Sequence, residues 1–312
     1  MAKDKVNIDE ELVNHAKQLV LLRERPLLIL NMETVNPMSV IQLEQELKGK
    51  DLSELDVLLH TTGGRIEPAF NIVKLLRKHS KKVEILIPSH AKSAGTLICF
   101  GADKLLMNTI AELGPLDVQI RESDEGGDGN VYKSALNGFK ALEQIQLHAL
   151  DNLDIATKMI IERTGSGIKM AEAIKLGIAF SGQTSSCLYN QLNPKMIGEY
   201  ARALEVGNRY AVLILTRFLG WSADKAREVA DKLVYGYPSH GFIIDTQELQ
   251  NLGLQAEEIN DTLKEAMDML KLILIRKDMK GGSLIKFLDY TPKKIVTEIK
   301  ETNKMKKSSN KK

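Results

Sequence analysis

Short apolar runs alternate with amphipathic segments between residues 27 and 107, and this alternation limits the possible folds more than any other feature. Four runs are apolar and β-compatible, which predicts strands at residues 27–30, 55–59, 83–87 and 103–107. The segments between them have the apolar spacing of helices, at residues 39–47, 68–78 and 94–100. Alternating strands and helices are typical of a parallel sheet with helices on its faces. We therefore predict an α/β fold.

The rest of the chain is expected to be mostly helical. Residues 9–23 have helical spacing, and residues 121–130 have the Ser, Asp, Glu and Gly composition of a loop. Further helices are expected at residues 134–163, within 165–182, and at 194–204, 210–219, 222–232 and 256–276, with a loop at 184–186. The last residues, 301–312, are basic and are expected to form a disordered tail.

The composition is that of an ordinary globular protein. Of 312 residues, 43% are hydrophobic and 27% are charged, and the formal net charge of +2 does not favour a nucleic-acid partner. The two cysteines, Cys99 and Cys187, argue against a disulfide framework. No signal peptide is visible, and the unbroken apolar runs fall far short of the ~20 residues that span a bilayer. We expect a cytoplasmic protein without a membrane span.

Two short motifs stand where predicted strands end and helices begin. Gly63 and Gly64 follow the second strand, and their backbone can turn sharply and direct N–H groups at a ligand. Ser93 stands at the entrance to the helix after the third strand, where the positive end of the helix dipole lies. Such a pair suits an oxyanion hole and a nucleophile. The alternative is that Ser93 is only a helix cap and the glycines only a turn.

A serine nucleophile needs a neighbouring base. Among the six histidines, His60 and His90 lie near the two motifs in the sequence, and His240 lies in a turn-rich segment that cannot be placed. Lys133 follows the Gly-rich loop and is expected to open the long helix, from where it could project into the site. Neither HExxH nor paired CxxC is present, and no Gly-rich nucleotide motif follows a strand, so we expect no metal and no cofactor.

Four ordered motifs resemble a known family. Residues 62–64 read Thr-Gly-Gly, residues 93–96 Ser-Ala-Gly-Thr and residues 113–119 Leu-Gly-Pro-Leu-Asp-Val-Gln, and residues 233–254 contain a Leu-x-x-Gly, His and Glu-x-x-x-Leu-Gly-Leu pattern. From residue 27 to 254 the chain resembles the serine dehydrogenase proteinase family. That family belongs to the Clp-protease and crotonase superfamily and is related to signal peptide peptidase A.

The resemblance implies a fold and a set of roles. It implies a Clp/crotonase-like ββα superhelix with additional C-terminal helices, the nucleophile Ser93, and an oxyanion hole formed by the N–H groups of Gly64 and Ala94. Membrane-associated relatives use a Ser–Lys dyad whose lysine matches Lys133. No histidine lies in the segment 113–119, where Clp subunits carry theirs, which also favours lysine. Lys158 and His240 stay open as other candidates for the base.

The resemblance also implies an organisation and partners. We expect an N-terminal helix at 1–25, the peptidase domain at 26–255, a helical extension at 256–300 and the tail at 301–312. A peptide or protein is the expected substrate, and superfamily members work as homo-oligomers, which the helix at 256–276 could mediate. Two other functions stay possible, namely a crotonase-type acyl-CoA enzyme and a non-catalytic scaffold that binds peptides. Val118 stands where the family usually has proline.

Overall fold

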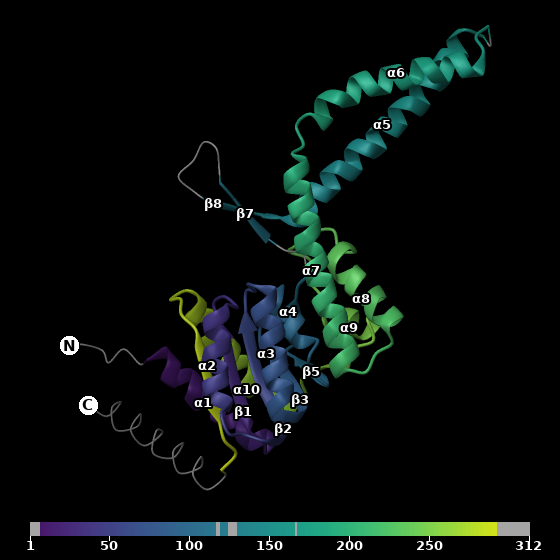
Figure 1. Cartoon of the computed structure of the whole chain (residues 1–312). Coiled ribbons are helices and arrows are strands. Elements are labelled where there is room, and N and C mark those ends of the chain that lie inside the picture. Colours follow the sequence, from purple (N-terminus) through teal and green to yellow (C-terminus); the bar gives the residue numbers. More distant parts are fainter. Residues whose placement is uncertain (1–6, 117–118, 124–129, 166, 292–312) are drawn as a thin grey trace. The chain divides into compact units, whose positions relative to one another are not determined.

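The computed structural model describes residues 7–116, 119–123, 130–165 and 167–291, with the side chains of 119–123 and 130–134 excepted (Figure 1). By its contacts the chain divides into two compact units, Met1–Leu116 with Gly207–Lys312, and Asp117–Val206. The helices Ile8–Arg23 and Asp261–Asp278 both lie in the first unit. The basic tail expected at 301–312 lies outside the described residues.

The first unit is built on a largely parallel sheet. Its main path runs in the order β10-β1-β2-β3-β5-β9, and the short strands β4 and β6 continue beside the end of β2. Only β10 pairs antiparallel in the described sheet, against β1. The strands are β1 (Leu27–Met32), β2 (Leu52–Thr61), β3 (Ser80–Ile87), β4 (His90–Ala91), β5 (Lys104–Met107), β6 (Glu112–Leu113), β9 (Ala256–Glu258) and β10 (Leu284–Leu288). The α/β class predicted from the sequence is confirmed.

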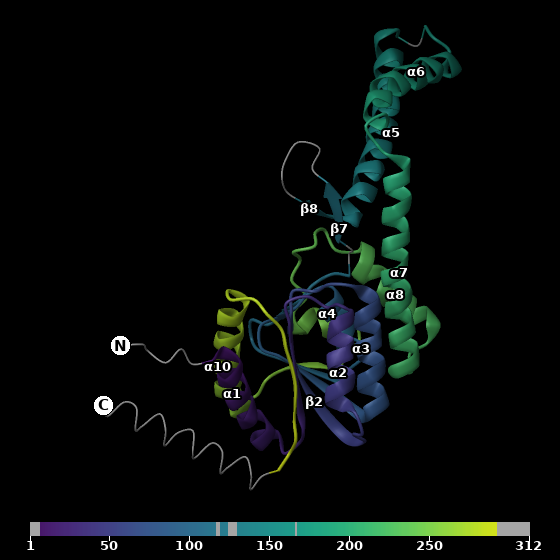
Figure 2. The same cartoon turned by 60° about the vertical axis from the view of Figure 1, so that its left-hand side comes forward.

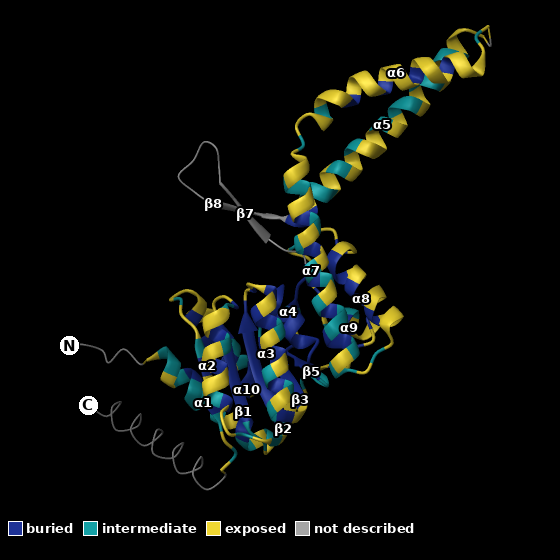
Figure 3. Ribbon diagram, in the orientation of Figure 1, coloured by how far each residue is buried: buried dark blue, intermediate teal, exposed yellow. Residues whose placement is uncertain are grey.

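Helices cover both faces of this sheet, which explains why its strands read as continuous apolar runs. On one face, α1 (Ile8–Arg23) and α10 (Asp261–Asp278) pack together over buried residues of β1, β2 and β3. The opposite face carries α2 (Pro37–Leu47), α3 (Ile66–His79) and α4 (Ala94–Cys99) (Figure 2). Strand β1 is accordingly buried throughout, and β2 and β3 are buried from Leu55 and Val83 to their ends (Figure 3). Two more helices of this unit are α8 (Ala223–Tyr235) and α9 (Thr246–Asn251).

The second unit contains a hairpin and long helices. Strands β7 (Gln119–Ser123) and β8 (Asn130–Ser134) pair antiparallel, and α5 (Ala135–Arg163) packs against α6 (Met170–Tyr189). The following helix, α7 (Pro194–Phe218), begins in this unit and ends in the first. Many side chains of α5 and α6 are exposed (Figure 3).

Several boundaries differ from the sequence predictions. The polar residues 184–186, expected to form a loop, lie inside α6, where the Thr184 hydroxyl donates back to the Phe180 carbonyl and so remains satisfied within a helix. The helices expected at 194–204 and 210–219 are the single helix α7, because Gly207, which lies between the two expected helices, does not end the helix. Ala256 begins a strand and not a helix, because it pairs with Leu105 of β5.

The prediction of a loop at residues 121–130 is also wrong at both ends of that range. Residues 119–123 and 130–134 form the paired strands β7 and β8, so Lys133 lies in a strand opposite Ile120 and does not open the long helix. The helix α5 begins only at Ala135.

Candidate functional site

Ser93 stands in a sharp turn between a strand and a helix. It joins β4 to α4 with φ 48° and ψ −110°, and Glu24 is the other residue besides glycine with positive φ in the described part of the chain. Such a backbone conformation costs about 1–3 kcal/mol and is retained mainly at functional sites. The Ser93 side chain makes no capping hydrogen bond to α4. The geometry is that of a nucleophile elbow rather than of a helix cap.

The Gly-Gly turn is held against the neighbouring loop by backbone bonds. The Val35 N–H donates to the Gly63 carbonyl at 2.7 Å, and the Arg65 N–H donates to the Val35 carbonyl at 2.8 Å. Both glycines have positive φ, 118° at Gly63 and 143° at Gly64. A Cβ on Gly64 would come within 2.4 Å of the Val35 carbonyl oxygen, so only glycine fits this position.

This bonding pattern leaves two backbone donors without an acceptor. The bonds around Val35 use the Gly63 carbonyl and the Arg65 N–H and bypass the Gly64 N–H. Ala94 is the first residue of α4, so its N–H has no acceptor within the helix. Among the residues that the structure describes, neither N–H donates to another residue. Both are therefore available to an external oxygen.

The turn that carries Ser93 packs directly on the end of β2. The Lys92 N–H donates to the Thr61 carbonyl at 3.1 Å, which continues the pairing of β4 with β2. A Cβ on Gly63 would lie 3.1 Å from the Ser93 Cβ, and one on Gly95 would lie 2.6 Å from Thr61 Cγ2. The structure thus brings the two motifs predicted from the sequence into contact.

The other two motifs adjoin this turn. The Thr96 hydroxyl lies 2.7 Å from the Gly114 carbonyl and accepts from the Gly114 N–H at 3.1 Å. The next bonds continue to the fourth motif, because Leu113 and Ile244 exchange both backbone bonds and the Leu116 N–H donates to the Leu233 carbonyl. Segments that are up to about 150 residues apart in the sequence therefore form one cluster around Ser93.

The three candidate bases lie in different parts of the chain. Lys133 is in β8 and its side chain lies outside the described residues, and Lys158 lies exposed on α5. Both belong to the second unit, whereas Ser93 belongs to the first. His240 belongs to the first unit, lies in a turn and is half-buried, and its carbonyl oxygen would be 3.8 Å from a Cβ on Gly114.

Lys92 is adjacent to Ser93 but already has partners. Its ammonium pairs with the Glu112 carboxylate at 2.8 Å and lies 3.4 Å from the Leu113 carbonyl. In the described part of the chain the Ser93 hydroxyl makes no capping hydrogen bond, and Lys92 is held by its own partners.

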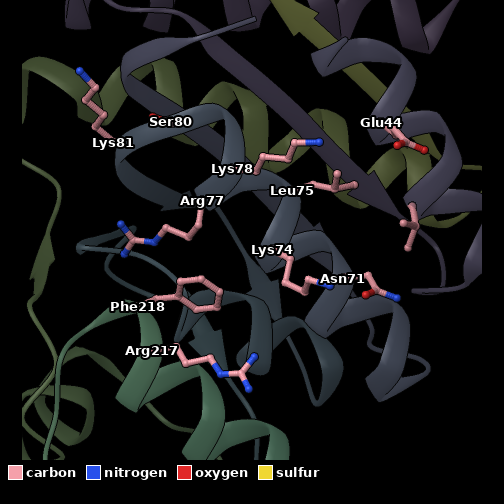
Figure 4. A pocket seen from close by; sticks show the side chains of 11 residues that line it. Glu44, Asn71, Lys74, Leu75, Arg77, Lys78, Ser80, Lys81, Arg217 and Phe218 are labelled. Carbon is pink, nitrogen blue, oxygen red and sulfur yellow. The ribbon is translucent and has the colours of Figure 1, made fainter. Parts of the chain in front are cut away.

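One cavity of about 740 Å³ lies away from these motifs, beside the end of α3 (Figure 4). Lys74 and Lys78 from α3 and Arg217 from α7 give its lining a basic character. The hydroxyl group in this lining, that of Ser80, donates to the Lys82 carbonyl. The cavity therefore offers positive charge but no activated nucleophile.

One acidic residue that the fold brings to two of the histidines is not among those proposed from the sequence. Asp278, at the end of α10, lies beside His60 of β2 and His90 of β4. No local signal could have revealed this, because 218 residues separate Asp278 from His60.

A serine elbow facing a Gly-Gly turn at the ends of parallel strands defines the class of Clp-like α/β proteins. Residues 42–164 match the family model of the ClpP-like SDH-type serine proteinases. The resemblance drawn from the sequence is thereby confirmed.

The similar curated proteins come from Methanocaldococcus jannaschii. Uncharacterized protein MJ0137 is 24% identical over 239 residues, which are 77% of this chain and 64% of that protein. Uncharacterized protein MJ1495 is 24% identical over 219 residues, which are 70% of this chain and 56% of that protein. The match thus spans about three fifths of the length of these relatives.

Similar solved structures include two mutants of the 1510-N membrane-bound stomatin-specific protease. A serine-to-alanine mutant is 16% identical, with 46% of this chain and 64% of that chain covered and a TM-score of 0.27. A lysine-to-alanine mutant in complex with a substrate peptide is 20% identical, with 46% of this chain and 68% of that chain covered and a TM-score of 0.27.

No helix in the described ranges is long and apolar enough to cross a bilayer.

Proposed function

We propose that the chain is a serine peptidase that cleaves peptide bonds through an acyl-enzyme on Ser93. One observation carries the proposal. A serine in a strained elbow lies beside two backbone N–H groups, those of Gly64 and Ala94, that have no acceptor in the described structure. A serine next to preorganised backbone donors is what acyl transfer requires. The family match supports the same reaction class.

In this mechanism the Ser93 hydroxyl attacks the scissile carbonyl carbon while a base takes its proton. The carbonyl oxygen becomes an oxyanion and accepts hydrogen bonds from the N–H groups of Gly64 and Ala94. Removing one such donor typically costs ~2.7–4 kcal/mol of transition-state stabilisation. The base then gives the proton to the leaving amine. Water, activated by the same base, hydrolyses the acyl ester and regenerates Ser93.

Lys133 is the base that we propose, on the family resemblance of its position after the loop. A lysine serves as a base when burial favours its neutral amine. Lys158 and His240 are the other candidates. For His240 there is one favourable observation, since its turn adjoins Gly114, which is bonded to Thr96 in the first turn of α4.

The substrate and setting are further parts of the proposal. We propose a peptide or protein substrate, a homo-oligomer and a cytoplasmic location. The superfamily resemblance supports the first two.

The proposal is tested by peptide hydrolysis with purified full-length chain and a fluorescein-labelled unfolded protein such as casein. We expect turnover by the wild type, none above background by Ser93→Ala, and unchanged turnover by Ser53→Ala, which removes an exposed hydroxyl on β2. Equal turnover by the wild type and Ser93→Ala would overturn the proposal. Hydrolysis of an acyl-CoA thioester without peptide hydrolysis would favour the crotonase-type alternative.

A further inference from the structure

Three side chains from distant parts of the chain meet on the α1/α10 face of the sheet. His60 stands near the end of β2, His90 in β4 and Asp278 at the end of α10. The His60 Nε2 atom lies 2.9 Å and 3.1 Å from the two Asp278 carboxylate oxygens, and the His90 Nε2 atom lies 4.0 Å from the nearer one. The two imidazole centroids are 4.2 Å apart. One potential ligand atom from each residue lies within 4.8 Å of the other two.

The hydrogen bonds within the protein satisfy only some of the polar atoms in this cluster. His90 Nδ1 lies 3.2 Å from the Ser89 hydroxyl, whereas His90 Nε2 is buried and has no hydrogen-bond partner. When Nδ1 carries the proton and donates to Ser89, the Nε2 lone pair faces the Asp278 carboxylate, acceptor against acceptor. In the other tautomer, Nε2–H lies too far from that carboxylate to donate. Either arrangement leaves a buried polar atom unpaired, which costs about 1–3 kcal/mol.

A cation between the lone pair and the carboxylate removes this conflict. The neutral imidazole is the form of histidine that binds metal ions. The bond from Nδ1 to Ser89 would fix the tautomer whose Nε2 atom faces the ion, as hydrogen-bond partners of metal-binding histidines commonly do.

We propose that His60, His90 and Asp278 bind a first-row divalent cation of the Zn²⁺ type. Two imidazoles and one carboxylate are a ligand set that suits zinc, with bonds of about 2.0–2.2 Å and a fourth position for water. To bind the ion, His60 must give up its hydrogen bond to Asp278, and both residues must coordinate the same metal ion instead. The carboxylate is partly exposed, at 36% of its side-chain surface, which provides the route of entry. Sequence analysis expected no metal site, because these ligands are scattered along the chain.

The location gives such an ion a structural consequence. His60 is three residues before Gly63, and His90 is three residues before Ser93. An ion bound by both histidines and by Asp278 would link the end of α10 to β2 and β4. Strand β2 leads into the Gly-Gly turn, and β4 leads into the Ser93 turn. Binding to the folded state alone would also raise the melting temperature.

The test is titration of Zn²⁺ into the full-length chain after EDTA treatment, followed by calorimetry, in a Cys187→Ser background that removes the exposed thiol. We expect one ion per chain. His90→Ala and Asp278→Asn should each weaken binding by at least about tenfold. His79→Ala, which removes an imidazole elsewhere, should leave binding unchanged.

Co²⁺ provides a spectroscopic check, since imidazole ligation gives visible absorption that Asp278→Asn should weaken. Asp278→Asn changes a partly exposed side chain at a helix end and should leave the circular dichroism unchanged, so a loss of binding in this variant is not a loss of folding. Absence of Zn²⁺ binding by the parent chain would overturn the proposal, and so would equal binding by the parent and Asp278→Asn.

Discussion

Gly63 lies directly against Ser93, because a Cβ added to Gly63 would stand 3.1 Å from the Ser93 Cβ. Gly63 also has φ 118°, which an L side chain rarely adopts. The residue after it carries one of the two free N–H groups. The spacing between the proposed nucleophile and the proposed oxyanion hole thus depends on the absence of one methyl group.

Gly63→Ala should therefore impair both stability and activity. We expect a loss of about 1–3 kcal/mol in the free energy of unfolding from the unfavourable φ, and at least about a tenfold loss of peptidase activity from displacement of Ser93. The matched control is Gly49→Ala, which has φ 74° but open space around the added Cβ. This control should lose stability without losing activity. Equal activity losses in the two variants would contradict the account.

The strained backbone at Ser93 predicts that glycine at this position gives a more stable protein than alanine does. Ser93→Gly should be inactive yet more stable than Ser93→Ala by about 1–2 kcal/mol, because glycine adopts φ 48° without strain and alanine retains the strain. Urea unfolding of the two inactive variants measures the difference. If the alanine variant proves equally stable or more stable, the elbow is not strained.

A buried carboxylate predicts a pH dependence of stability. Burial opposes ionisation of Glu84, but hydrogen bonds from Lys82 and Arg23 outweigh it and lower its pKa from 4.5 to about 2. A lowered pKa in the folded state stabilises the fold above pH 4.5, and this contribution is lost as the pH falls through about 2.

Glu84→Gln should therefore cost about 2 kcal/mol of unfolding free energy at pH 7, and the cost should shrink as the pH falls from about 4.5. Urea unfolding at a series of pH values checks this. Asp56 pairs with Glu84 across β2 and β3, and its pKa is raised, mainly by burial. Asp56→Asn should therefore not reproduce this pH profile. A constant difference between the wild type and Glu84→Gln at all pH values would disprove the linkage.

The identity of the base can be tested by measuring how fast a fluorophosphonate labels Ser93 when each candidate base is replaced. Lys133→Ala should abolish labelling of Ser93 if Lys133 is the base, while Lys158→Ala and His240→Ala should label at the wild-type rate. A wild-type rate in Lys133→Ala, with loss in one of the other two variants, would transfer the role to that residue. Circular dichroism on each variant verifies that the fold is retained.

Much of the fold could be predicted because the signals are local. Apolar strands that alternate with amphipathic helices identified β1, β2, β3 and β5, and the helices between them, since each pattern depends on residues close in sequence. Polar composition was misleading within α6, where the Thr184 hydroxyl bonds to its own helix. The strand β9 was missed because three residues become a strand only through pairing with β5.

The candidate site divides in the same way. Ser93 and Gly64 could be proposed because the turns that carry them directly follow apolar strands and belong to ordered motifs. The meeting of Asp278 with His60 and His90 could not be predicted, since it arises from the packing of α10 on the sheet. The base of Ser93 could not be predicted from spacing alone for a related reason, because it depends on contacts between side chains.

The central claim is that Ser93 is the nucleophile, and mass mapping after fluorophosphonate labelling tests it most directly. The wild-type chain should gain one probe mass on the tryptic peptide that contains Ser93, and Ser93→Ala should gain none while its fold is retained. Absence of labelling at every pH from about 6 to 10, the range over which a histidine or buried lysine base titrates, would contradict the claim. Labelling of Ser93→Ala at another residue at the wild-type rate would contradict it as well.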